Sequence, residues 1–416
     1  MIYSDCFIFG GSENIIENLL KSDSLTNKYN MVFYYAFNKR YKETVGKKFP
    51  SFSNVHSVQI LSAYNKWGYE KQLKKRKSFF VKLYIHTRYF ISLIFQKAGF
   101  YSAYNFLKLY KLFKNESPDI LYINNGGYPG AQSCRMAVLS AKKSGIKNII
   151  FNVNNLALPQ KGIIDKWLDK KIDSTVKIFI TASKAAKEKL IEQRRFTFSK
   201  CINIPNTILK EKEICSRSIE SSLKREFKVR SDEIVLGAAG LLTTRKGFDI
   251  LIEAVHHLVK KKIVFKLFIF GEGEKRVYLE NKIKDNGLTK TVILPGYKNN
   301  ILQYMKDFDV FICPSVNSED FPYVILEAML LGKPVIGTSV AGIPEQIIDR
   351  YNGFIVAPGN AELLANAMFE MISDRKLIQT MGDNSYKRYV ENFSYGNIIN
   401  RYDQLFNLVT NKTTSF

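Results

Sequence analysis

The most constraining feature of the chain is a regular alternation of short apolar runs with amphipathic segments. Apolar runs of about four to eight residues are typical of strands buried on both faces of a parallel sheet. The amphipathic segment after each run supplies the crossover that parallel strands need. The alternation therefore predicts an α/β fold of doubly wound sheets. The expected strands are 2–6, 29–37, 119–124, 148–153 and 177–183, then 233–240, 266–271, 292–296, 310–315, 334–339 and 353–358.

The segments between these runs have helical periodicity. In 248–260, for example, Leu251, Val255 and Val259 fall on one face. The same pattern predicts helices at 13–21, 131–143, 184–193, 275–286, 301–308 and 324–331.

The length of the chain indicates more than one core. Its 416 residues exceed what one ordinary core holds, so we expect two domains. A hydrophobic content of 46% excludes a disordered chain or a low-complexity fibre. The polar stretch 209–233 has no strand pattern. We therefore expect a linker there, between a first domain at 1–208 and a second at 234–390.

Neither a membrane-spanning helix nor a secretion signal is expected. The most apolar long run, 79–95, is interrupted by two basic residues and a histidine. Asp5 and the Gly10-Gly11 pair stand where a signal peptide would need an apolar core. Five scattered cysteines show neither a disulfide pattern nor zinc-ligand spacing. These features together predict a cytoplasmic protein.

The positive charge is concentrated in the first half of the chain. Residues 1–200 hold 34 basic and 13 acidic side chains, whereas 201–416 hold 28 and 25. The stretch 64–114 has twelve basic residues, one acid and many aromatic residues. This mixture fits a surface on anionic lipid, and it also fits a solvated helical face with a packed apolar side. No nucleic-acid-binding motif accompanies the charge, so we expect no nucleic acid partner.

Three features carry chemistry, and the first is Gly10-Gly11-Ser12-Glu13, directly after the first expected strand. Glycines at this position let the backbone approach a ligand, and the N–H groups of a helix start attract phosphate. The motif lacks the full GxGxxG pattern, and a turn with two glycines is about as often structural.

The second feature is the loop 240–247, between an expected strand and an expected helix. Arg245 and Lys246 stand at the carboxyl end of the strand, where open α/β sheets bind ligands. Their charges could neutralise a diphosphate. Taken alone, the two cations are as readily explained as solvated loop residues.

The third feature is the segment 318–345. Pro322 suits the first turn of a helix, which puts Glu319 before the helix and Glu327 within it. Because an unpaired carboxylate among apolar neighbours is costly, we expect Glu327 to have a hydrogen-bonding partner. The hydroxyl groups of a ligand are one candidate.

This last segment resembles the donor-binding segment of family-4 retaining glycosyltransferases, and so does the Arg245-Lys246-Gly247 loop. The resemblance covers roughly residues 10–402 and is strongest after Val235. Its landmarks are Glu319 and Glu327 with seven residues between them, Gly332-Lys-Pro-Val, Ala341-Gly-Ile-Pro-Glu345, Gly271-Glu-Gly273, Pro295-Gly296-Tyr297 and Asn352-Gly353 through Pro358.

The resemblance implies a GT-B architecture, in which two Rossmann-like domains face each other across a cleft. The acceptor would bind mainly to the first domain and a nucleotide sugar to the second, and a helix within 391–416 would cross back to the first. The implied activity is that of a hexosyltransferase-type, retaining glycosyltransferase. It would act on a glycan or lipid-linked glycan in the synthesis of bacterial capsule, exopolysaccharide or O-antigen. No cofactor besides the nucleotide sugar is implied.

The resemblance also implies roles for particular residues. Glu319, Lys246 and Arg245 would be catalytic. Glu327 would bind the ribose hydroxyls, and Gly11 would approach the donor phosphates. The other implied donor contacts are Gly240, Gly271, Tyr297, Phe321, Tyr323 and Val324.

Two positions depart from the family pattern. Leu241 stands where many members have an arginine, a charge that Arg245 could supply. Asn154 and Asn155 stand where many members have a histidine, and we expect these asparagines to contact the acceptor. Positive side chains and helix starts would stabilise the leaving group, so we expect a reaction without a bound metal.

Two other interpretations stay open. A nucleotide-sugar epimerase of related fold would convert its substrate without an acceptor. A non-catalytic scaffold could bind a membrane or nucleic acid, although Glu319, Glu327 and Lys246 argue against the loss of activity. Within the transferase interpretation, the basic first domain favours a polyprenyl-diphosphate-linked acceptor at the inner face of the plasma membrane, with peripheral contact through 64–114.

Overall fold

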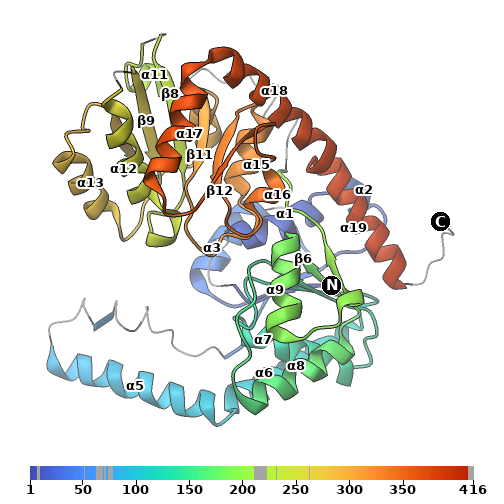
Figure 1. Ribbon diagram of the computed structural model, residues 1–416. Coiled ribbons are helices and arrows are strands. Elements are labelled where there is room, and N and C mark those ends of the chain that lie inside the picture. Colours follow the sequence, from blue (N-terminus) through green and yellow to red (C-terminus); the bar gives the residue numbers. More distant parts are fainter. Residues whose placement is uncertain are drawn as a thin grey trace. The chain divides into compact units, whose positions relative to one another are not determined.

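The computed structural model describes residues 1–6, 10–50, 52–61, 69, 72–73, 78–209, 223–230, 232–261 and 263–410. The chain forms two compact units, each built on a parallel sheet (Figure 1). Unit 1 comprises Met1–Ile180, Lys189–Ile202 and the chain from Asp403 onward. Unit 2 comprises Thr181–Glu188 and Asn203–Tyr402.

Unit 1 contains a seven-stranded sheet in the order β3-β2-β1-β4-β5-β6-β7. Because β1 pairs in parallel with both β2 and β4, the direction in which strands are added reverses between β1 and β4. β5 is buried along its whole length, as a sheet covered on both faces requires. The strands are β1 (Ile2–Ser4), β2 (Phe33–Ala36), β3 (Val55–Val58), β4 (Leu121–Asn125), β5 (Ile149–Val153), β6 (Ile178–Thr181) and β7 (Cys201–Asn203).

Helices α6, α7 and α8 of unit 1 pack in succession, with α7 in contact with both neighbours. Figure 1 shows α5 extending away from the sheet of this unit, and its buried residues are Ile85 and Ser92. The helices are η1 (Gly11–Glu13), α1 (Asn14–Leu20), α2 (Asp23–Thr26), α3 (Lys39–Lys48), α5 (Phe79–Lys97), α6 (Phe100–Glu116), α7 (Gln132–Lys143), α8 (Gly162–Thr175) and η2 (Phe198–Lys200).

Unit 2 contains a six-stranded sheet in the order β10-β9-β8-β11-β12-β13. β8 pairs in parallel with β9 on one side and β11 on the other, so the order of addition reverses between β8 and β11. The strands are β8 (Ile234–Ala239), β9 (Phe265–Phe270), β10 (Val292–Gly296), β11 (Val310–Cys313), β12 (Val335–Thr338) and β13 (Gly353–Val356).

The core of unit 2 forms where helices pack on both faces of this sheet. The apolar face of α12 is buried, as its periodicity predicts, and α12 packs on α17. The helices are α11 (Leu223–Glu226), η3 (Thr244–Lys246), α12 (Phe248–Val259), α13 (Arg276–Asp285), α14 (Ile301–Met305), α15 (Tyr323–Leu330), α16 (Ile343–Gln346), α17 (Ala361–Ser373) and α18 (Arg375–Asn392).

Two helices run from one unit into the other. α9 (Lys184–Arg194) starts in unit 2 and ends in unit 1, and so does α19 (Tyr395–Thr410). In unit 1 the end of α19 is held by Lys28, whose Nζ lies 2.8 Å from Asp403, and by an edge-on contact between the rings of Tyr29 and Phe406. The last expected segment, 391–416, therefore contains a helix that ends in unit 1.

The predicted α/β fold is confirmed, and a strand lies within or next to each of the eleven expected strand regions. Two strands were not predicted. β3 is a partly exposed edge strand that contains a histidine and a serine, and β7 has three residues, so neither forms an apolar run.

Some sequence predictions fall outside the described residues. These are residues 210–222 and 231 of the expected linker, residues 64–68, 70–71 and 74–77 of the basic stretch, and Cys215. Among the residues that the structure does describe, no helix is both long and apolar enough to cross a membrane. Among the described cysteines, Cys6, Cys134, Cys201 and Cys313 form no disulfide bond.

Candidate functional site

The strongest candidate site lies in unit 2, where the strand order reverses between β8 and β11. Loops that leave the carboxyl ends of such a strand pair diverge, and the crevice between them is the usual ligand site of an open α/β sheet. The loop after β8 contains Arg245 and Lys246, and the segment after β11 contains Glu319. The topology of the sheet thus brings two distant parts of the chain to one edge.

These three residues form one ion-paired cluster, which we call the charged trio. Arg245 Nη1 lies 2.6 Å and Lys246 Nζ 2.7 Å from the same oxygen, Glu319 Oε2. Ser315 Oγ donates to that oxygen as well, at 3.3 Å. The side chains of Lys246 and Glu319 are each only 10% exposed, so the pair is largely shielded from water. The structure therefore brings together the three residues predicted to be catalytic.

A glycine at the end of η3 lets the two loops meet. Gly247 has a φ of +67°, and a Cβ atom at this position would lie 2.1 Å from the carbonyl oxygen of Pro314. The backbone N–H of Val316 donates to the carbonyl of Arg245 at 2.9 Å. Any side chain at 247 would both strain the backbone and separate the loops. The Arg-Lys-Gly sequence is thus explained by geometry as well as charge.

The predicted donor contacts Gly240 and Gly271 lie at the ends of adjacent strands. A Cβ atom on Gly271 would be 1.9 Å from the carbonyl oxygen of Gly240. Gly240 N–H donates to Phe270, and Gly271 N–H to Gly296, which ties the loops after β8, β9 and β10 together. Tyr297, which follows β10, is exposed. Because these glycines carry no side chain, the backbones of adjacent loops approach closely at this edge of the sheet, beside the charged trio.

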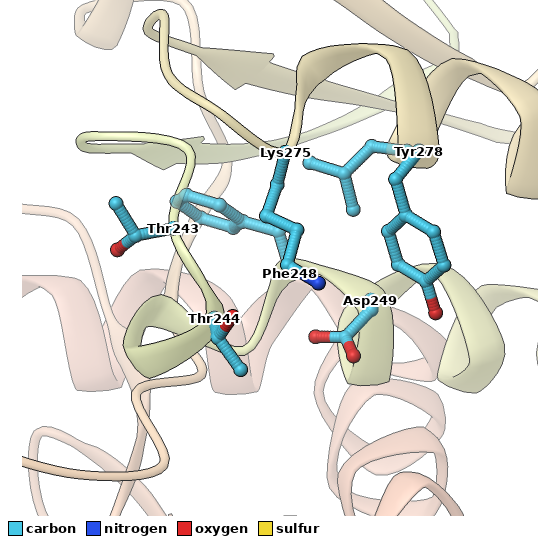
Figure 2. A pocket seen from close by; sticks show the side chains of 7 residues that line it. Thr243, Thr244, Phe248, Asp249, Lys275 and Tyr278 are labelled. Carbon is cyan, nitrogen blue, oxygen red and sulfur yellow. The ribbon is translucent and has the colours of Figure 1, made fainter. Parts of the chain in front are cut away.

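Figure 2 shows the other side of the loop after β8. Here Thr243 and Thr244 precede the cations, and Phe248 and Asp249 begin α12. Lys275 extends toward this helix start, and its Nζ lies 4.6 Å from the centre of the Tyr278 ring. The depression in Figure 2 is lined by no member of the charged trio, so this side of the loop packs toward α13.

Helix α15 carries the other predicted glutamate. Pro322 is the residue that caps α15, and Glu327 lies within the helix as expected. Glu327 is half-buried, and no described residue forms a hydrogen bond or ion pair with its carboxylate, so the expected protein partner is not found. Burial among apolar side chains raises the pKa of Glu327 to about 7.

The remaining predicted donor contacts surround the start of α15. Phe321 is buried and its ring packs edge-on against Phe393, at 5.5 Å between centroids. Tyr323 and Val324 are half-buried on the first turn of the helix. Phe321 therefore has a packing role within unit 2, whereas Tyr323 and Val324 remain partly accessible.

Sequence reasoning missed Asp320, the neighbour of Glu319. Asp320 is buried and accepts a hydrogen bond from Ser183 Oγ. Burial, together with the nearby carboxylates of Glu345 and Glu319, raises the pKa of Asp320 to about 7. An acidic residue next to a motif gives no local signal that it is buried.

Unit 1 has an equivalent reversal point between β1 and β4, with different chemistry. Gly11 begins η1 there and is exposed, as a residue that approaches a ligand should be. Glu13 is fully buried, and its carboxylate accepts hydrogen bonds from Ser4 Oγ at 2.6 Å and Asn124 Nδ2 at 3.2 Å. Tyr41 donates to it at 3.3 Å. Sequence reasoning gave no role to Glu13.

Asn124 joins Glu13 to the end of the next strand. Its Oδ1 accepts hydrogen bonds from Nδ2 of Asn152 at 2.9 Å and of Asn154 at 2.8 Å. We call Glu13 and these three asparagines the amide network. Asn155 is exposed, and its side chain accepts a hydrogen bond from the N–H of Leu156. Of the two predicted acceptor contacts, Asn154 is thus partly occupied within the protein and Asn155 is accessible.

The described residues contain no group of three or more His, Cys, Asp and Glu with the geometry of a metal site. One Asp-x-Asp sequence, Asp307-Phe308-Asp309, precedes β11 at the amino end of the strand. Its carboxylates accept hydrogen bonds from the backbone N–H groups of Leu223 and Val235. These aspartates therefore serve the opposite edge of the sheet from the charged trio.

The chain is similar to several known proteins. Residues 220–388 match the family described as Glycosyl transferases group 1. An uncharacterised glycosyltransferase of Methanocaldococcus jannaschii, MJ1607, is 34% identical over 179 residues, which are 42% of this chain and 45% of that protein. The UDP-Gal:alpha-D-GlcNAc-diphosphoundecaprenol alpha-1,3-galactosyltransferase of Escherichia coli is 24% identical over 310 residues, or 73% of this chain and 78% of that protein.

The fold is also that of solved glycosyltransferases. Anabaena HepE, solved in complex with UDP, has a TM-score of 0.75 at 18% identity, over 98% of this chain and 99% of that one. The glycosyltransferase of Rickettsia africae has a TM-score of 0.73 at 17% identity, over 99% of both chains. The chain therefore has the GT-B fold of two Rossmann-like units, carries a match to glycosyl transferases group 1 in unit 2, and is an enzyme of the glycosyltransferase class.

Proposed function

We propose that the protein is a family-4 retaining glycosyltransferase that moves a hexose from a nucleoside-diphosphate sugar to a lipid-linked glycan. The observation that carries the proposal is the charged trio at the reversal point of the unit 2 sheet. The solved structures of HepE contain UDP or UDP-glucose, which supports a uridine nucleotide as the donor. The names of the E. coli and Staphylococcus aureus relatives, which specify galactosyl and N-acetylglucosaminyl transfer, support a hexose.

The charged trio suits a diphosphate leaving group. When the glycosyl bond breaks, negative charge grows on the diphosphate oxygen, and cations already in place there stabilise it. Glu319 holds Arg245 and Lys246 through one oxygen, and both cations keep further N–H groups for phosphate. Glu319 Oε1 accepts no hydrogen bond from a described residue, so it is available to a hydroxyl of the donor sugar.

Glu327 suits the ribose of the nucleotide. Its half-buried carboxylate has two acceptor oxygens and no partner among the described residues. Two ribose hydroxyls would supply the donors that the helix does not. This role follows the family resemblance, and the burial of the carboxylate is its physical support.

The reaction is proposed to need no metal and no cofactor. The reason is that Arg245 and Lys246, which lie together at Glu319, would supply the positive charge that a metal ion otherwise provides to a diphosphate. Turnover should then be unchanged after the enzyme is treated with EDTA. Restoration of lost turnover by Mg²⁺ or Mn²⁺ would contradict this part of the proposal.

The acceptor is proposed to be a polyprenyl-diphosphate-linked glycan in bacterial surface-polysaccharide synthesis, bound through Asn154 and Asn155. The E. coli relative is named for such an acceptor, and another relative is the capsular polysaccharide biosynthesis glycosyltransferase CapM of Staphylococcus aureus. Peripheral membrane contact through 64–114 is part of this proposal. α5 contains no acidic residue, and its exposed aromatic side chains include Phe79, Phe80 and Phe90.

Nucleotide binding and donor hydrolysis test the proposal. Calorimetric titration should show UDP binding to the wild-type protein, and UDP-hexoses should be hydrolysed slowly without an acceptor. With a lipid-linked acceptor, proton NMR of the new linkage should show the α configuration of an α-linked donor. An inverted product would contradict the retaining mechanism, and conversion of the free nucleotide sugar to its epimer would contradict transfer altogether.

A further inference from the structure

The start of α8 in unit 1 presents apolar side chains to solvent. Ile163 and Ile164 are 86% and 81% exposed, and Trp167, one turn later, is 56% exposed. Leu158, in the connection before the helix, is 59% exposed. We call these four residues the α8 tip. A cluster of this kind on a folded unit marks a surface that contacts another apolar phase.

All three acidic residues of the same helix are engaged by other residues of unit 1. Asp165 pairs with Arg135 at 2.5 Å and with Arg194 at 2.8 Å. Asp169 is buried and pairs with the same Arg194 at 2.8 Å. Asp173 is also held by the protein, since it accepts two hydrogen bonds. Asp169 lies on the buried side of the helix together with Leu168 and Ile172, whereas Ile163, Ile164 and Trp167 lie toward solvent.

Lysines surround the exposed apolar residues. Lys161, Lys166, Lys170 and Lys171 are exposed, and Lys171 Nζ lies 5.8 Å from the centre of the Trp167 ring. The usual surface helix buries its apolar stripe and exposes charges of both signs. In α8, Leu168 and Ile172 are buried in the usual way, but Ile163, Ile164 and Trp167 are exposed as well. The exposed charged residues of the helix, Lys166, Lys170 and Lys171, all carry the same sign.

We propose that the α8 tip is a membrane anchor that inserts into the interface of a bilayer containing anionic lipid. Ile163 and Ile164 would enter the boundary of the acyl chains, and Trp167 would lie at the headgroup level, where indole rings are enriched. The lysines would contact the anionic headgroups. A second copy of the chain fits less well, because a symmetric pairing of this patch would bring two rings of lysines together.

The anchor is separate from the membrane contact proposed for α5. Helices α6 and α7 lie between α5 and α8 in the packing order of unit 1, so the α8 tip is a second region of the same unit. The short connection 154–161 joins the end of β5 to α8 and carries Asn154 and Asn155. If the proposed function holds, the anchor would bring the lipid surface to the edge of the sheet where those residues meet the acceptor.

Trp167 itself supplies the measurement. The chain has two tryptophans, so Trp67→Phe makes Trp167 the sole tryptophan, which can be excited selectively over the tyrosines. Its emission should shift to the blue on titration with vesicles of phosphatidylglycerol and phosphatidylcholine, and bromine-labelled lipids should quench it. Pure phosphatidylcholine should give a much weaker shift. In the same background, Ile163→Ser with Ile164→Ser should weaken vesicle binding by about tenfold or more.

A matched control changes an exposed apolar residue elsewhere in unit 1. Leu408 is exposed on α19, and Leu408→Ser should leave vesicle binding unchanged. The serine pair on α8 should also leave UDP affinity unchanged. If the wild-type protein does not bind UDP, that result contradicts the proposed function, whereas vesicle binding tests the anchor separately.

Three outcomes would overturn the inference. The protein could float with anionic vesicles while the emission of Trp167 stays constant, which would assign all contact to other regions. It could fail to bind any vesicles. A blue shift that depends on protein concentration without lipid, together with a doubled mass in light scattering, would identify a second copy as the occupant of the α8 tip.

Discussion

The two units share a topology and differ in the chemistry at its reversal point. In unit 2, the residues at the carboxyl ends of β8 and β11 form the charged trio, with two cations on one carboxylate oxygen. In unit 1, the equivalent ends of β1 and β4 carry the amide network, in which Glu13 receives hydrogen bonds from uncharged donors only. One fold thus offers two cations around a carboxylate in one unit and only uncharged donors around a carboxylate in the other.

The charge of these donors bears on which unit is suited to a diphosphate. Cations that keep free N–H groups attract phosphate, whereas a buried carboxylate that is fully engaged with neutral donors holds the local backbone in place. Changes in the charged trio should therefore reduce nucleotide binding and turnover with little effect on stability. Changes in the amide network should reduce stability with little effect on nucleotide binding.

The largest expected effect comes from Lys246→Ala. Loss of a preorganised positive charge at the leaving group should lower kcat by about 100-fold to 1000-fold. Arg245 and Ser315 still reach Glu319, so the melting temperature should change little. Steady-state kinetics and a thermal melt measure the two effects. The matched control is Lys275→Ala on the α13 side of the same loop, which should retain turnover.

Either of two results for Lys246→Ala would contradict the role given to the charged trio: full turnover, or loss of the folded state. In the first case the charge on Lys246 would have no part in transfer. In the second, the cluster would be structural and equivalent to the amide network.

The next largest effect concerns how the two loops of the charged trio meet. Gly247→Ala should destabilise the protein by about 3 kcal/mol, because it combines a positive φ with a clash against the Pro314 carbonyl. Gly359 has a φ of +75° and no atom within 4 Å of a new Cβ atom. Gly359→Ala should therefore cost only about 1 kcal/mol. Urea denaturation of both variants separates the clash from the backbone strain, and equal losses would show that the close approach does not matter.

These residues also show how far the sequence could be read. The order of strands and helices followed from apolar runs and periodicity, and the charged trio followed from motif resemblance, because its members lie at predictable places after β8 and β11. The amide network was not predicted, since Glu13, Asn124 and Asn154 come from three strand ends and none has a local pattern that reports burial. Asp320 was missed for the same reason.

Helix α8 shows the limit most clearly. Its acids at four-residue spacing look like the solvated face of an ordinary amphipathic helix. In the structure, Arg135 and Arg194 from elsewhere in unit 1 pair with two of those acids, and Asp169 is buried beside Leu168 and Ile172. These ion pairs join residues that are distant in the sequence, so no local pattern contains them.

The amide network gives the third prediction. Asn124→Ala removes a donor to Glu13 and the acceptor shared by Asn152 and Asn154, so it should lower the free energy of unfolding by about 2 kcal/mol. UDP affinity should stay within about twofold. The control is Asn155→Ala at an exposed position, which should change stability by less than about 0.5 kcal/mol. A loss of UDP affinity without a loss of stability would reverse the roles assigned to the two units.

The smallest effect is the pH dependence of nucleotide binding through Glu327. The pKa of its carboxyl group is raised to about 7 in the free protein, so the carboxylate form becomes dominant as the pH rises from 6 to 8. A carboxylate accepts hydrogen bonds from ribose more strongly than the protonated acid does. UDP affinity should therefore increase about fivefold across this range in the wild-type protein, beyond any change seen in Glu327→Gln. The variant reports the change that comes from the ionisation of UDP itself, so the difference between the two proteins isolates the effect of Glu327.

The same group affects stability with the opposite sign. The folded protein holds this proton to a higher pH than the unfolded chain does, so the free energy of unfolding should fall as the pH rises from about 4.5 to 7. Glu327→Gln should reduce that slope. As a separate variant, Asp320→Asn should reduce it too, because the pKa of Asp320 is also raised to about 7. Denaturation of the three proteins at several pH values measures this. Glu327→Gln could leave both the stability slope and the pH dependence of UDP affinity unchanged. In that case burial does not raise the pKa of the Glu327 carboxyl group, and Glu327 is not part of the nucleotide site. The charged trio alone would then have to define where the donor binds.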